Sequence, residues 1–89
     1  MEKAGQLMGS LQFNLKETLD QLKITRNKLA VESKTRPATI LDLVSGDTKR
    51  LELSTIVAML DTLNQFAKEK GYREFTFHDI LEYIPDNNE

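Results

Sequence analysis

The stretch TRNKLAVESKTRPATILDLVSG, from Thr25 to Gly46, decides the expected fold because it holds two short helices with almost nothing between them. Its first half has a threonine placed to cap a helix, apolar residues at Leu29 and Ala30, and room for about two turns. Its second half begins near a proline, which has no amide to donate and a φ suited to a first helical turn, so a helix is expected over residues 37–44. The Ser-Gly pair at its end favours the left-handed conformation that closes a helix.

Two short helices joined by a turn of about three or four residues cross steeply and need a small residue where their axes approach. Ala30 occupies that place, and Leu29, Ile40 and Leu43 are expected to lock the pair. The outer side of the second helix is then left exposed. This arrangement is a helix-turn-helix, whose second helix enters the major groove of DNA.

Three further helices are expected around this pair. The sequence Asn-Leu-Lys-Glu at 14–17 resembles a capping box and opens a helix at Leu15. The longest helix is expected over 54–70, with a serine as its cap and a glycine behind it. A second capping box, Thr-Phe-His-Asp at 76–79, opens a last helix that Pro85 stops.

The expected fold class is therefore all-α, a compact five-helix domain over residues 14–85. Residues 1–13 contain two glycines and a serine without sustained periodicity, so they are expected to form a flexible N-terminal arm. Residues 86–89 are expected to be a disordered tail. Residues 72–77 alternate polar and aromatic side chains, which leaves an extended conformation open, although no partner strand is visible.

Composition excludes several classes of function. The chain has 89 residues, 39% of them apolar, which suits a single domain. It has neither an apolar run of membrane-span length nor a signal-peptide block, so a cytoplasmic protein without membrane attachment is expected. The absence of cysteine and the single histidine, His78, predict no metal and no cofactor. Without a nucleophile and base in suitable spacing, the chain is not expected to be an enzyme.

Charge is distributed unevenly along the chain. Residues 23–50 hold seven basic and three acidic side chains, a net charge of +4, whereas the remaining residues hold five basic and eleven acidic side chains, a net charge of −6. A basic segment with acidic flanks indicates one surface that faces a polyanion.

From Asn14 to Pro85 the chain resembles the Xre/Cro family of helix-turn-helix domains, the repressor fold of phages and mobile elements. The run LKETLDQLKITRNKLAVESKTRPATILDLVSGDTKR is similar to the first three helices and basic loop of that family, and DILEYIPD is similar to the end of its small variants. The resemblance implies a five-helix Cro/repressor-like domain that acts as a sequence-specific transcriptional regulator, in particular a repressor. It also implies a homodimer on a pseudo-palindromic operator in double-stranded DNA.

The resemblance assigns two sets of DNA contacts. Base contacts are expected from the cap and outward face of helix 37–44, which comprise Arg36, Pro37, Ala38, Leu41 and Asp42. Phosphate contacts are expected from Thr25, Arg26, Asn27, Thr39, Thr48, Lys49 and Arg50. Within the first set, Arg36 has the paired donors that read guanine, whereas Ala38 and Leu41 suit thymine methyl groups. One departure concerns Lys34, which stands where the family commonly has a turn glycine with positive φ.

An alternative function stays open, because Pro37, Ala38 and Leu41 offer no hydrogen-bond donors to base edges. The scaffold is then a protein-binding module or an antagonist of another regulator, with a protein as its partner. For the homodimer, the contact surface is expected outside the basic segment, at Val57, Met59, Tyr83 and Ile84.

Overall fold

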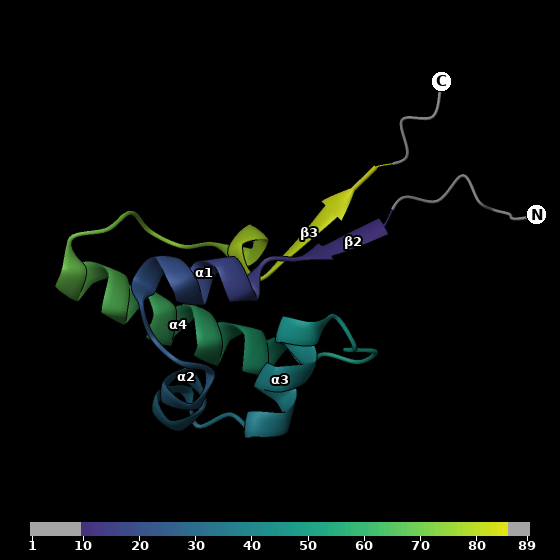
Figure 1. Ribbon diagram of the computed structural model, residues 1–89, viewed down its shortest axis with the longest axis horizontal. Helices are drawn as coiled ribbons and strands as arrows, with labels where there is room; N and C mark the ends of the chain where they lie inside the picture. The colour runs from purple at the N-terminus through teal and green to yellow at the C-terminus, as the bar shows by residue number, and fades with distance from the viewer. Residues whose placement is uncertain (1–9, 86–89) are drawn as a thin grey trace, which may run out of the picture.

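The computed structural model describes residues 10–85, which form four α-helices and a two-stranded antiparallel sheet (Figure 1). Their order along the chain is β2 (Ser10–Phe13), α1 (Leu15–Leu22), α2 (Arg26–Ser33), α3 (Pro37–Ser45), α4 (Leu53–Lys70), the 3-10 turn η1 (Phe77–Asp79) and β3 (Leu81–Ile84). In this part of the chain, every helix is too short or too polar to cross a membrane.

A single apolar cluster joins the helices. Helix α2 packs against both α3 and α4, and the largest side chains with almost no exposed surface come from all four helices and the segment before β3: Leu15, Leu22, Leu29, Ile40, Leu43, Met59, Leu63 and Ile80. Each such side chain contributes about 1.5–3 kcal/mol by leaving water. Truncating one to alanine therefore costs about 2–5 kcal/mol.

All four helices end in the left-handed conformation, two of them at lysine and two at glycine. Lys23 and Lys34 each have φ 58°, while Gly46 and Gly71 have φ 81° and 74°. At the end of α2, the amide of Thr35 donates to the carbonyl of Ala30 at 3.0 Å, which closes the helix. The helix-turn-helix turn thus forms with a lysine in the conformation that glycine usually supplies.

The expected five-helix, all-α fold is wrong. Instead of a fifth helix, residues after Thr76 form one turn of 3-10 helix and then the strand β3, which pairs antiparallel with β2. The fold is a mixture of α and β. Residues 10–13 of the expected flexible arm form β2, while residues 1–9 and the expected tail at 86–89 lie outside the described residues.

The sheet forms because polar and apolar side chains alternate along both strands and because Asn14 bonds the two ends of the domain together. Leu11 pairs with Tyr83 and Phe13 pairs with Leu81, so four apolar residues share one face. The Asn14 amide donates to the carbonyl of Ile80 at 2.8 Å, and its side-chain Nδ2 donates to the carbonyl of His78 at 2.9 Å and to Glu82 Oε1 at 3.1 Å. Its side chain makes no cap hydrogen bond to α1, so the predicted capping box at 14–17 is wrong although the helix does begin at Leu15.

The other helix boundaries follow the sequence closely. Helix α2 ends at Ser33 as expected, α3 begins at Pro37 and runs one residue beyond Val44, and α4 ends at Lys70. The start of α4 differs, because Glu52 rather than a serine is its N-cap residue and no side chain caps it.

The loop between α4 and β3 is irregular rather than extended into a strand. Asn64 on α4 anchors it, donating through Nδ2 to the Phe75 carbonyl at 2.9 Å and accepting the Phe75 amide at 2.6 Å. The Arg73 guanidinium bonds both oxygens of Asp79, at 2.8 and 3.1 Å, and lies 4.5 Å from the centre of the Phe75 ring. The hydrogen bond from Arg73 lowers the pKa of Asp79, and the amide of Thr76 lowers it further.

Candidate nucleic-acid interface

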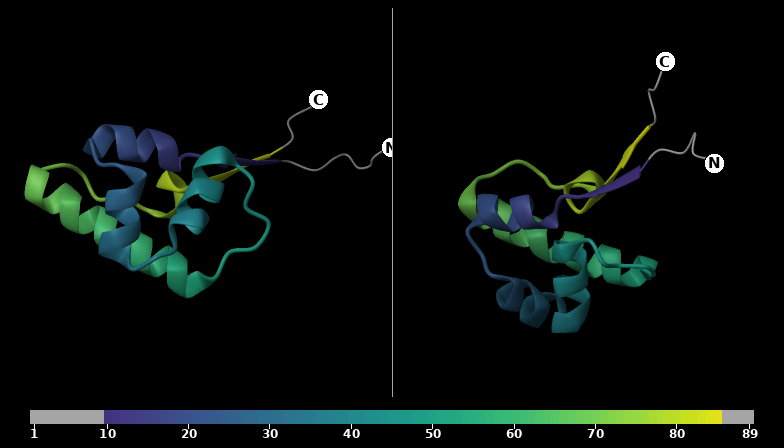
Figure 2. Two further views of the ribbon diagram at one scale, coloured as in Figure 1. Left: turned by 60° about the horizontal axis from the view of Figure 1, so that its bottom comes forward. Right: turned by 45° about the vertical axis from the view of Figure 1, so that its right-hand side comes forward.

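The crossed pair α2 and α3 is locked as the sequence predicts. Leu29, Ile40 and Leu43 have no exposed surface, and Ala30 is 2% exposed where the helices approach. Figures 1 and 2 show the two helices crossing steeply beside α4. Since these contacts use one side of each helix, the outer side of α3 is left uncovered by the described part of the chain.

The N-terminus of α2 forms one edge of this surface. The Thr25 hydroxyl accepts the amide of Lys28 at 3.0 Å, so the predicted cap is confirmed. The first amides of a helix have no acceptor within it and carry a partial positive charge, and the first turn of α2 has no acidic residue. Arg26 and Asn27 are exposed here. This end of α2 therefore suits an anion such as a backbone phosphate.

The predicted base-contact residues are all exposed, but they do not share one face. Ala38, Leu41 and Asp42 lie on the outer side of α3, where Leu41 is 47% exposed despite being apolar, and Pro37 lies at its start. Arg36, the N-cap residue, lines the hollow between α3 and α4 instead. Positions 38, 41 and 42 are three and four residues apart, which places them on one helical face. Arg26, Asn27, Pro37 and Leu41 line a groove of about 230 Å³ between the start of α2 and α3.

The loop after α3 forms the opposite edge of the surface. Together with the helix it encloses a hollow of about 340 Å³, lined by Thr39, Asp42, Asp47, Thr48, Lys49 and Arg50. Lys49 and Arg50 are exposed, whereas Thr39 is half-buried. The Thr48 hydroxyl is buried without a hydrogen-bond partner in the described chain, so it is not presented to a phosphate in this conformation. The predicted phosphate contact of Thr48 is therefore not supported by its position.

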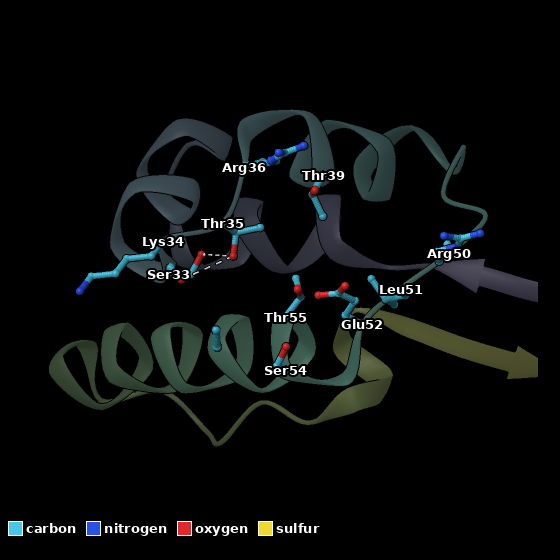
Figure 3. A pocket seen from close by; sticks show the side chains of 11 residues that line it. Ser33, Lys34, Thr35, Arg36, Thr39, Arg50, Leu51, Glu52, Ser54 and Thr55 are labelled. Carbon is cyan, nitrogen blue, oxygen red and sulfur yellow. Dashed lines mark hydrogen bonds between the residues drawn. The ribbon is translucent and has the colours of Figure 1, made fainter.

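A third and larger hollow, of about 700 Å³, separates the turn and start of α3 from the start of α4 (Figure 3). On one wall the Ser33 hydroxyl donates to the Thr35 hydroxyl at 2.9 Å, and on the other Glu52 and Thr55 point toward α3. The sequence marks Lys34 only as a turn residue and does not mark Glu52 or Thr55, because the hollow exists only once α3 and α4 are packed.

Four basic side chains around the outer face of α3 have no ionic partner among residues 10–85. Within residues 10–85 the ion pairs are Lys16–Asp20, Lys28–Glu32 and Arg73–Asp79, so no carboxylate of this range lies within 4.0 Å of the charged groups of Arg26, Arg36, Lys49 and Arg50. Their charges are available to a polyanion. The same range contains no group of three histidine or carboxylate side chains able to hold a metal ion.

No family model, curated protein or solved structure matches the chain. The candidate interface is therefore defined by its geometry alone. An exposed helical face is held by a rigid crossed pair, with one helix N-terminus on one edge and a basic loop on the other.

Proposed function

We propose that the protein is a cytoplasmic, sequence-specific DNA-binding regulator that inserts α3 into the major groove. The observation that supports this most strongly is the outer face of α3, which residues 10–85 leave uncovered, with four basic side chains around it that form no ion pair within that range. A bound dimer excludes polymerase from an overlapping promoter, so repression is the mode of action that we propose.

Each part of the interface has a separate task in this proposal. Arg36, exposed at the start of α3, donates two hydrogen bonds to N7 and O6 of a guanine. Arg26 and the free amides of α2 hold one phosphate, and Lys49 and Arg50 hold the backbone on the other side. The phosphate contacts fix the register of α3, and the base contacts select the sequence.

The proposal requires a homodimer, because two recognition helices must lie roughly 34 Å apart to read two half-sites. Leu11 and Tyr83 are 56% and 61% exposed, and their cross-strand pairing places them on one face of a ribbon that projects from the helices (Figure 2). Val57 is 56% exposed and also remains available. Met59 has no exposed surface, so its expected part in the dimer contact is wrong. We propose that this face of the sheet meets the sheet of a second copy.

Selection of bound duplexes from a random pool, at two salt concentrations, tests the proposal. We expect an enriched inverted repeat, affinity that falls steeply with salt, and a mass in solution of two chains. A flat salt response with no enriched sequence would refute DNA recognition.

A protein-binding module is the second candidate, favoured by the exposure of Leu41 beside Pro37 and Ala38. The variant Leu41→Lys separates the two functions. A protein contact centred on Leu41 would be lost, whereas non-specific DNA affinity would be kept or raised because a positive charge is added.

A further inference from the structure

The groove between the start of α2 and α3 is apolar at its centre. Pro37 has no amide proton, and the Leu41 side chain is 47% exposed at this place. Arg26 and Asn27 complete the lining, and Ala38 is exposed on the same helix next to Pro37. Past the cap residue Arg36, the outward side of α3 therefore offers a ligand van der Waals contact and no hydrogen-bond donor.

We propose that this groove reads the 5-methyl group of thymine, with Leu41 as the residue that sets the specificity. The proposal rests on the proposed function, since it requires α3 in a major groove. In the major groove of DNA, the 5-methyl group of thymine is the one apolar group on the base edges, and cytosine lacks it. A leucine that would otherwise stay half in water gains from covering a methyl group.

Asp42, the neighbour of Leu41, supports this choice of base. Its carboxylate is exposed and has no basic side chain of residues 10–85 within 4.0 Å. A carboxylate only accepts hydrogen bonds, so it repels the N7 and O6 acceptors of guanine and favours the amino groups of adenine and cytosine. Methyl contact at Leu41 and an acceptor at Asp42 together favour A·T pairs at this part of the half-site.

The expected effect follows from the transfer of one methyl group out of water. About 0.8 kcal/mol per buried carbon corresponds to about a fourfold change in affinity. Two half-sites double the free energy, so the change for a symmetric operator is about fifteenfold.

Replacing thymine with deoxyuridine tests the proposal, since this removes the methyl group and leaves every hydrogen-bonding group in place. Binding of the full chain to its selected duplex is measured by fluorescence anisotropy, with one thymine replaced per half-site in each duplex. We expect one position at which replacing thymine with deoxyuridine lowers the affinity of the wild type about fifteenfold. At that position, replacement by 5-methylcytosine should weaken binding less than replacement by cytosine.

The variant Leu41→Ala should lose most of the sensitivity to deoxyuridine at that position. Val31→Ala is the matched control, because Val31 is an exposed apolar residue of α2 that does not line the groove, and it should keep the full sensitivity. If no position responds to deoxyuridine while the duplex still binds, methyl reading is overturned and the proposed function stands. Equal sensitivity in Leu41→Ala and wild type would also overturn it, and failure to bind any duplex would overturn both proposals.

Discussion

Replacing Lys34 with glycine should raise the free energy of unfolding, although it removes a side chain. Lys34 ends α2 with φ 58° and ψ 37°, inside the left-handed region where a Cβ is crowded by the neighbouring carbonyl. The residue is exposed, so its side chain has little packing to lose. The turn of the helix-turn-helix is thus held against a local backbone preference.

The magnitude follows from two opposing effects. The left-handed conformation costs a non-glycine residue about 1–2 kcal/mol, which glycine avoids. Glycine also lowers the stability by about 0.4–1 kcal/mol, because it gives the unfolded chain more conformational freedom. The net gain is roughly 0.5–1 kcal/mol, which at about 4–8 °C per kcal/mol raises Tm by about 2–8 °C in a domain of this size.

Thermal unfolding followed by circular dichroism measures this shift. Lys34→Ala is the matched control, because it removes the same charge and stem but keeps the Cβ, so its Tm should stay near that of wild type. Gly71→Ala is the reverse test, since a Cβ there meets no atom within 4 Å at φ +74° and its cost of about 1 kcal/mol comes from the backbone alone. Equal Tm values for Lys34→Gly and Lys34→Ala would refute the reasoning.

Three other outcomes are expected from the same structure. Lys49→Ala with Arg50→Ala should reduce the slope of log K against log salt by about 1.8 per half-site, because each phosphate contributes about 0.9, and an unchanged slope would remove both residues from the interface. Tyr83→Lys should halve the mass measured by light scattering, because a charge on the exposed face of the sheet opposes its pairing with a second copy, and a persistent dimer would place the contact elsewhere. Since Arg73 lowers the pKa of Asp79 in the folded protein, the stability from this pair is present above the ordinary carboxyl pKa and is lost as pH falls through the lowered value. Urea titrations should therefore show Asp79→Asn less stable than wild type at pH 7, with the difference shrinking below about pH 4.

Much of the candidate site was predictable because its signals are local. The cap at Thr25, the proline at the start of α3 and the buried positions of the crossed pair each depend on residues within one or two helical turns. The exposure of the predicted base-contact residues follows from the same periodicity. The burial of the Thr48 hydroxyl could not be predicted, because it depends on how the loop folds and not on the residues beside it in the sequence.

The sequence by itself determined the helix-turn-helix and the basic segment around it, since a helix is specified by capping, turn chemistry and the spacing of apolar residues along one stretch of chain. Only the tertiary structure decided that Leu81–Ile84 is a strand. Its partner, Ser10–Phe13, lies at the other end of the domain, and Asn14 bonds to His78, Ile80 and Glu82 instead of capping α1. A strand needs the hydrogen-bonding groups of a second strand, and a segment read alone does not show whether a distant one is brought beside it.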